Sequence, residues 1–355
     1  MYNQGVYHRV PTWAVAITTV LIVSTCVAAV WVVPADSQTV GGLSVLCSIA
    51  PLASLVNEIG GAYVKVDVML PEGVEPHSFT ATPELINKAA QADLLVLTGH
   101  FAWEEAIADQ VTTPGITLGD YEEFGARLSP LEGLAEEHEH DHEGNPHGYW
   151  LLPTNAIAIA NATRHTLAEM NSTIASIVNA NFNLFVQRVR GVLQFISELD
   201  QEYHFSDMKV LLVFPAEAYV AETFGMRPVG VIQKGDNIFV SGNELLQIQA
   251  ELMNHTISLI AGSDTAQLQT AGDIARQLAS DTMSRILWWK TMFTGTSDYT
   301  TLIAYNAGIL TDALMGVGLG NNTQAIYILA ALSAVMGLIA VVEAIVIVRT
   351  RARLV

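Results

Sequence analysis

The sequence predicts an α/β fold: two lobes with parallel sheets, joined by a long helix and flanked by N- and C-terminal transmembrane helices. Three observations support this prediction. Strand-like and helix-like apolar runs alternate in two separate regions, which is typical of parallel sheets covered by helices. A long helical run, residues 154–205, separates these regions. Apolar runs of membrane-spanning length lie at residues 12–33 and 325–348.

The first predicted lobe covers residues 43–153. Short runs rich in Val and Leu predict buried strands, and Pro or Gly marks the ends of the helices between them. Thr82 and Pro83 form a typical helix start. The expected strands are Leu43–Ser48, Val64–Leu70 and Asp93–Leu97, and the expected helices are Pro51–Ile59, Glu84–Gln91 and Trp103–Ala108.

The connecting helix is predicted over residues 154–205, with a break near Met170 to Ser172. Apolar residues recur along it at three- and four-residue spacing, and it is interpreted as a rigid connector between the two lobes. The alternation then restarts in a second lobe, residues 206–318. Its expected strands are Val210–Val213, Val229–Ile232, Ile257–Ile260 and Arg285–Trp288, and its expected helices are Ala216–Phe224, Asn243–Met253, Ile274–Ala279 and Tyr299–Leu314.

The two terminal apolar runs predict a topology. Residues 12–33 carry no charge and are interpreted as a signal-anchor or a signal peptide. Residues 325–348 are followed by a basic tail, residues 349–355. Basic residues stay on the cytoplasmic side, so this tail and residues 1–11 should be cytoplasmic. The bulk of the chain is then extracellular or periplasmic.

Net charge bears on the partners of the protein, and glycosylation signals bear on its location. The formal net charge of −19 argues against nucleic-acid binding, which needs basic surface, and suits attraction of cations. Four glycosylation sequons predict a glycoprotein, and they begin at Asn161, Asn171, Asn254 and Asn321.

A histidine-rich acidic segment, residues 133–147, stands out in the first lobe. It contains His138, His140, His142 and His147, with Asp and Glu between them. Imidazole and carboxylate are ligands that zinc prefers, so the first three histidines are predicted to form a metal-collecting loop. The alternative is a solvated acidic linker without a binding role.

The segment His138–His142 also matches the HExxH pattern of zinc peptidases. That pattern requires a helix with an apolar face. Here the segment is polar on all sides, and Gly144 and Pro146 follow it. A peptidase is therefore disfavoured.

Another histidine, His77, lies in the loop that follows the second predicted strand. Loops at the carboxyl ends of strands are where open α/β sheets place ligand groups. Further motifs lie along residues 43–315: Glu75–Pro83, Ala92–Gly99 with Glu104, Pro146–His147, Trp150–Ala156, Pro215–Ala216 with Tyr219, Phe224–Gly225, Tyr299 and Asn306.

Together these motifs resemble the ZnuA-like solute-binding proteins, which are the metal-binding receptors of zinc and manganese ABC importers. The resemblance implies two lobes with one metal ion, zinc or manganese, in the cleft between them. It also implies an ABC permease in the membrane as partner.

Carried over residue by residue, the resemblance assigns His77 and His147 as the first two metal ligands. It places the third ligand where this chain has Phe214, and the fourth where it has Gly295. Two expected ligands are therefore missing.

Candidates for the missing ligands are acids in the second lobe. Glu217 lies about one helical turn after Phe214, and Asp298 is the first acid after Gly295. The predicted metal site is accordingly His77, His147, Glu217 and Asp298. Asp264, His100 and the loop histidines are further candidates, and for His100 a role without metal is favoured.

The expected function is a membrane-anchored extracellular receptor that captures a divalent cation for an ABC importer. The sequence shows no nucleophile–base pair, phosphate loop or paired carboxylates, so an enzyme is not expected. The missing ligands leave two alternatives. One is a diverged adhesin or metal-traffic regulator. The other is a receptor for a metal chelate or small organic ligand, in a cleft lined by Phe214, Trp288 and Trp289.

Overall fold

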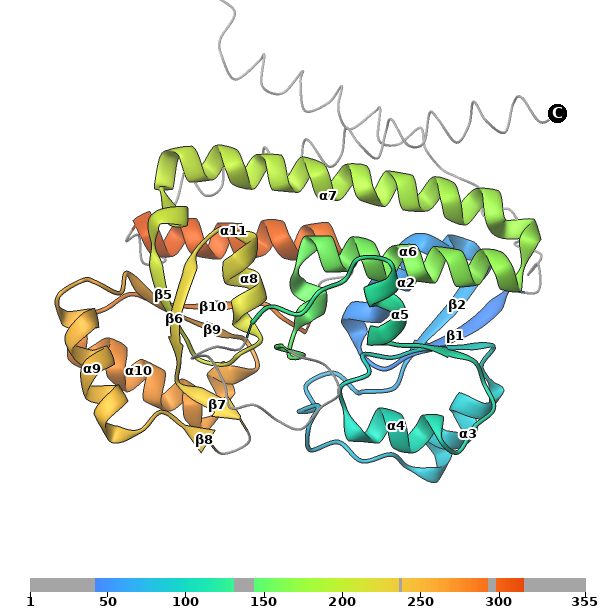
Figure 1. Ribbon diagram of the computed structural model, residues 1–355, viewed down its shortest axis with the longest axis horizontal. Helices are drawn as coiled ribbons and strands as arrows, with labels where there is room; N and C mark the ends of the chain where they lie inside the picture. The colour runs from blue at the N-terminus through green and yellow to red at the C-terminus, as the bar shows by residue number, and fades with distance from the viewer. Residues whose placement is uncertain (1–41, 131–143, 236–237, 293–297, 316–355) are drawn as a thin grey trace, which may run out of the picture. The chain divides into compact units, whose positions relative to one another are not determined.

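The computed structural model describes residues 42–130, 144–235, 238–292 and 298–315. From Leu43 onward these residues belong to one compact unit. The unit contains two four-stranded sheets, one in each lobe, and every strand pair in both sheets is parallel (Figure 1). The predicted α/β build of two parallel-sheet lobes is confirmed.

The sheet of the first lobe has the strand order β2-β1-β3-β4. Its centre is β1, where Val45, Leu46 and Cys47 are almost fully buried because helices cover both faces. Thr82 caps α3 by accepting a hydrogen bond from the Leu85 N–H, as the sequence predicts. The strands are β1 Leu43–Cys47, β2 Val64–Val68, β3 Leu94–Val96 and β4 Gly115–Ile116, and the helices are α2 Ala50–Gly60, α3 Pro83–Gln91, α4 Ala102–Ala108 and α5 Leu118–Glu123.

The sheet of the second lobe has the order β10-β9-β5-β6. A short antiparallel hairpin, β7-β8, lies beyond β6 in the chain and was not predicted. The strands are β5 Lys209–Leu212, β6 Arg227–Val231, β7 Gln233–Gly235, β8 Ile238–Phe239, β9 Leu259–Ser263 and β10 Ile286–Trp289. The helices are α8 Glu217–Thr223, α9 Gly242–Met253, α10 Thr270–Thr282 and α11 Tyr299–Met315.

Two consecutive helices, α6 (Pro153–Met170) and α7 (Ala175–Tyr203), connect the lobes. The predicted break lies between them at Asn171, whose side chain accepts a hydrogen bond from the Thr173 N–H. Helix α7 packs on α2 of the first lobe and on α11 of the second (Figure 1). It is therefore a rigid element shared by both lobes. Short 3-10 helices lie at Gly61–Tyr63, Tyr149–Leu151, Ser172–Ile174, Phe205–Asp207 and Ala266–Leu268.

Several residues of the sequence motifs hold the backbone together. Asn306 accepts from the Lys290 N–H and donates to its carbonyl, so it fixes the end of β10. The Tyr299 hydroxyl donates to the Leu151 carbonyl of the connecting region at 2.7 Å. Asn155 is fully buried and makes three hydrogen bonds to backbone groups. These residues have structural roles.

The predicted fold class was wrong in including N- and C-terminal transmembrane helices. Within the described ranges, no helix has the length and apolar character needed to cross a membrane. The longest described helix, α7, has 29 residues, but charged side chains such as Arg188, Arg190 and Glu198 recur along it. The fold is corrected to two lobes with a connecting helical region, and residues 12–33 and 325–348 lie outside the described residues.

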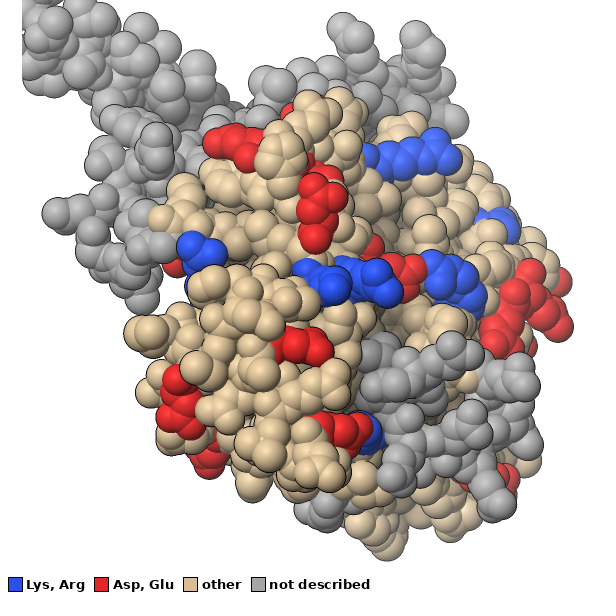
Figure 2. All heavy atoms as spheres, turned by 60° about the vertical axis from the view of Figure 1, so that its left-hand side comes forward, with Lys and Arg blue, Asp and Glu red and all other residues tan. Residues whose placement is uncertain are grey.

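Acidic and basic side chains lie interspersed on the face shown in Figure 2. In the second lobe, Lys234 forms an ion pair with Glu244, and Arg276 forms one with Asp273. Exposed pairs of this kind contribute little to stability. The face seen in Figure 2 is not a continuous basic surface of the kind that binds nucleic acid.

Candidate metal centre

His77 lies on the loop between β2 and α3. The indole N–H of Trp103 donates to the Pro76 carbonyl at 2.9 Å, which ties this loop to α4. Phe79 packs edge-on against the same indole, with ring centroids 5.0 Å apart. One buried tryptophan therefore holds both sides of His77.

His100 follows β3, and a buried carboxylate holds its backbone. Glu104 is 1% exposed and accepts hydrogen bonds from the N–H groups of Thr98, His100 and Phe101. Gly99 has a φ of +69°, and a Cβ there would lie 3.2 Å from a backbone nitrogen of α5. Glycine and the capping glutamate together fix the turn that carries His100.

His147 lies on the segment that leads into α6, next to the second lobe. Its backbone N–H donates to Asn145 Oδ1 at 3.0 Å, while Asn145 Nδ2 donates to the Pro215 carbonyl at 2.8 Å. Gly148 has a φ of +78°, and a Cβ there would meet Ala216 at 3.0 Å. The backbone around His147 is thus held by direct contact with the start of α8.

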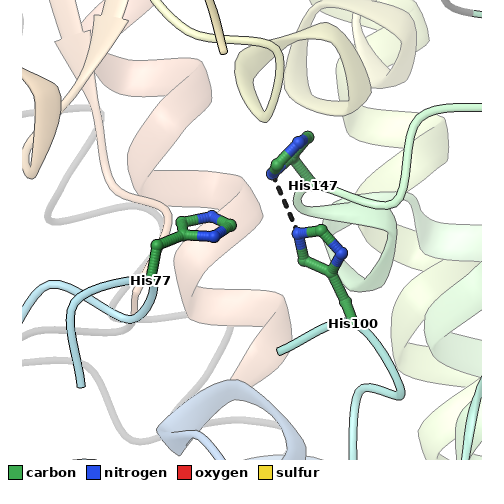
Figure 3. A group of neighbouring side chains, drawn as sticks. All are labelled: His77, His100 and His147. Atoms are coloured by element: carbon green, nitrogen blue, oxygen red, sulfur yellow. Dashed lines mark hydrogen bonds between the residues drawn. The ribbon is translucent and has the colours of Figure 1, made fainter. Parts of the chain in front are cut away.

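The three imidazoles converge on one point (Figure 3). One ring nitrogen from each of His77, His100 and His147 lies within 4.8 Å of the other two. His100 Nε2 and His147 Nδ1 are hydrogen-bonded at 3.0 Å. Tetrahedral zinc with Zn–N bonds of about 2.0 Å separates its ligand nitrogens by about 3.3 Å. This pair is already close to that spacing, so small side-chain movements would complete a three-nitrogen site.

The imidazoles face a cavity of about 250 Å³ between the lobes. From the first lobe, the aromatic side chains of Phe79, Phe101 and Trp103 line it. From the second lobe, Phe214, Pro215 and Gly235 line it. Apart from the three histidines, the side chains that line the cavity are therefore apolar.

Comparison with known proteins agrees with this geometry. Residues 45–313 match the family described as zinc-uptake complex component A, periplasmic (ZnuA). The chain belongs to this family. It is 23% identical over 245 residues to the high-affinity zinc uptake system protein ZnuA of Yersinia pestis, a match that covers 62% of this chain and 75% of that protein. It is 22% identical over 256 residues to ZnuA of Bacillus subtilis (strain 168), covering 68% and 76%.

Solved structures share the fold of this ZnuA-family chain. A crystal structure of ZnuA superposes with a TM-score of 0.63 at 19% identity, covering 77% of this chain and 99% of that one. The solute-binding protein FpvC of Pseudomonas aeruginosa, in complex with Mn²⁺, gives 0.64 at 18% identity, covering 78% and 99%. The resemblance inferred from the motifs is confirmed.

The structure does not bring Glu217 to the histidines of this ZnuA-family chain. Its side chain is fully buried at the start of α8, where one carboxylate oxygen accepts the Phe214 N–H. Burial raises the pKa of Glu217 to about 8, although hydrogen bonds from Ser263 and Phe214 lower it. Glu217 therefore bonds to nearby groups of its own lobe instead of reaching the cavity.

Asp298 is also separate from the described histidine group. It caps α11 by accepting hydrogen bonds from the Thr301 N–H at 2.9 Å and the Thr300 hydroxyl at 2.7 Å. Burial acts to raise the pKa of Asp298, but the hydrogen bonds from Thr301 and Thr300 outweigh it and lower the pKa. Asp264 likewise accepts the Thr265 N–H at 3.1 Å, in the turn after β9.

His100 was not among the four residues of the predicted site, although a signal for it exists in the sequence. It follows a predicted strand, as His77 does, and both neighbouring strands pair with β1 in parallel. Their carboxyl ends therefore meet at one edge of the sheet. The loop histidines His138, His140 and His142 lie outside the described residues, and their metal-collecting role stays a prediction.

Proposed function

We propose that this chain is a receptor that binds a divalent cation, zinc, through His77, His100 and His147. It would present the ion to an ABC permease from an extracellular or periplasmic location. The observation that supports this proposal most strongly is the convergence of three imidazole nitrogens within 4.8 Å on the interlobe cavity. Membership of the zinc-uptake family supports transport rather than catalysis as the use of this site.

Zinc is favoured over manganese by the donor atoms. The described cluster offers three imidazole nitrogens and no carboxylate oxygen. Imidazole suits zinc, whereas manganese prefers carboxylates, carbonyls and water. In the Irving–Williams order manganese also binds more weakly than zinc to the same ligands. A site of this composition should therefore select zinc, even though relatives of similar fold bind manganese.

The loop histidines are proposed to assist capture without forming the main site. They lie in an acidic segment just before Gly144 in the sequence. Acidic side chains attract cations and raise their local concentration. Substituting His138, His140 and His142 by alanine should therefore slow zinc association and leave one tight site.

Zinc titration calorimetry tests the proposed binding function. The parent is the full chain with the three loop histidines replaced by alanine, so that only one class of site is observed. It should bind one zinc ion tightly, and His77→Ala should lose that binding because two imidazoles alone form a poor site. A parent that binds no zinc would contradict the proposal and favour the adhesin or regulator alternative. Retention of tight binding by His77→Ala would show that the ion is bound elsewhere.

Transport needs a separate test in the cells that make the protein. Zinc accumulation from a zinc-limited medium should fall when the chain is removed, and the unmodified chain should restore it. The His77→Ala chain, produced at the same level, should not restore it. Full restoration by His77→Ala would contradict the proposed role of this site in uptake.

A further inference from the structure

The cavity around the histidines offers little to balance the charge of a bound dication. Neutral imidazoles supply no negative charge, and the lining residues of the described part of the chain include no Asp or Glu. The nearest second-lobe acid in sequence, Glu217, faces the Phe214 N–H. Among the described lining residues, nothing would balance the +2 charge of a zinc ion held by these histidines.

An uncompensated charge in a cavity that is shielded from bulk water is unfavourable. Ions that leave water are normally paired with an opposite charge or bound by enough polar groups to replace their hydration. Zinc also prefers four ligands, and the described cluster provides three. Both requirements are met if one small anion occupies the fourth position.

The second-lobe side of the cavity would supply no ligand for a fourth coordination position. Phe214 and Pro215 follow β5, and Gly235 ends β7. None of the three has a side chain that can bind a metal. The cavity of about 250 Å³ is several times the roughly 30 Å³ that one water molecule occupies in the liquid. It has room for a cation together with a small anion.

We propose that the bound cation keeps its fourth coordination position for a monodentate anion taken from solution, such as hydroxide, a halide or a small carboxylate. This inference rests on the proposed metal-binding function. The anion forms one bond to the metal and displaces water, with no change of oxidation state. The cargo of this receptor is then a metal–anion pair. The side chain of Phe214 has no metal-binding atom, so the coordination position remains available to the anion.

Binding of the two partners should be coupled. If the anion stabilises the metal complex, the metal must raise the affinity for the anion by the same factor. Couplings between ligands are typically about 5- to 150-fold. Metal affinity should therefore increase when the anion is added.

The test uses Co²⁺ as the metal and azide as the anion, in the full chain with the loop histidines replaced by alanine. Azide should change the visible absorption of the Co²⁺ complex in a saturable manner with one binding constant. Phe214→His, which adds a fourth protein ligand, should abolish this change. The matched variant Phe214→Leu removes the ring without adding a donor, so it should keep a saturable azide response.

Two results would overturn the inference. A cobalt complex that forms normally but does not respond to azide would show that the fourth position is not available, while leaving the proposed binding function intact. Asp236 follows Gly235 in the sequence and lies outside the described residues, so Asp236→Ala is the second control. An azide response that appears only in Asp236→Ala would show that a protein carboxylate holds the position. Failure of Co²⁺ to bind at all would contradict the proposed function itself.

Discussion

The two lobes share one architecture but contribute unequally to the candidate site. Each has a four-stranded parallel sheet, and each directs the loops at strand ends toward the cavity. The loops after β2 and β3 supply His77 and His100, whereas the segment after β5 supplies Phe214 and Pro215. The comparison teaches that both lobes provide equivalent positions at strand ends, and that the residue at each position decides whether a lobe can offer a metal ligand.

Each lobe also has one buried glutamate near the cavity, and the two glutamates have different roles. In the first lobe Glu104 accepts hydrogen bonds from three backbone N–H groups and from the Thr98 hydroxyl. In the second lobe Glu217 accepts a hydrogen bond from the Phe214 N–H. The first carboxylate supports the turn that carries His100, whereas the second bonds to the backbone of Phe214, which lines the cavity.

The largest expected effect comes from removing an imidazole of the first lobe. His147→Ala should lower zinc affinity by more than about 100-fold, because even residues that only orient metal ligands contribute about 10- to 100-fold. The exposed His165 on α6 is the matched control, and His165→Ala should bind zinc like the parent. Equal affinities of the two variants, measured by competition with a zinc chelator, would remove His147 from the site.

The second-largest effect is expected at Glu104, the buried glutamate of the first lobe. Glu104→Gln keeps the side-chain size but replaces one acceptor oxygen by a donor, which then faces backbone N–H groups. Zinc affinity should fall about 10- to 100-fold because the His100 turn loses its support. The free energy of unfolding should fall by about 1.5–3 kcal/mol, the contribution of a hydrogen bond to a charged group. Urea denaturation and zinc titration measure the two quantities, and an unchanged zinc affinity would separate Glu104 from the site.

A smaller effect is expected where the lobes meet. Asn145 is fully buried and joins the His147 N–H to the Pro215 carbonyl. Asn145→Ala leaves both groups without this partner, so the free energy of unfolding should fall by about 1–3 kcal/mol. Asn145→Asp, which keeps the acceptor for His147, should retain more zinc affinity than Asn145→Ala. The reverse order would show that the link to Pro215, not the support of His147, matters for binding.

The smallest effect on zinc binding is expected at Glu217, where the effect on stability takes the form of a pH dependence. The pKa of Glu217 is raised from 4.5 to about 8, so between these values the folded protein binds more protons than the unfolded chain. Its contribution to stability is therefore complete at low pH and is lost as the pH rises through this window. The slope approaches about 1.4 kcal/mol per pH unit. Between pH 5 and pH 8, Glu217→Gln should lose less free energy of unfolding than the parent. Denaturation at a series of pH values measures this difference. The variant should bind zinc with the affinity of the parent.

The fold was largely predictable because buried parallel strands and amphipathic helices leave strong local patterns. The strands around Val45 and Leu95 are continuous apolar runs, and the break at Asn171 has its own capping residue. The strand Gly115–Ile116 and the β7-β8 hairpin were missed because elements of two or three residues leave no periodicity.

The site was less predictable because it depends on pairings between distant segments. His77 and His147 stand out through local motifs, but His100 reaches them only because β2 and β3 flank β1. Glu217 has the sequence position of a solvent-facing helix residue, yet its side chain turns back to the Phe214 N–H. The spacing of apolar residues in the sequence does not distinguish a carboxylate that bonds to its neighbouring backbone from one that reaches a ligand.

X-ray absorption at the zinc edge tests most directly whether the first lobe alone supplies the protein ligands. The sample is the zinc-loaded full chain with the loop histidines replaced by alanine. The account predicts three imidazoles and one further light-atom ligand, with one imidazole fewer in His100→Ala and no change in Glu217→Gln. A parent with only two imidazoles, or a zinc environment that changes in Glu217→Gln and not in His100→Ala, would contradict it.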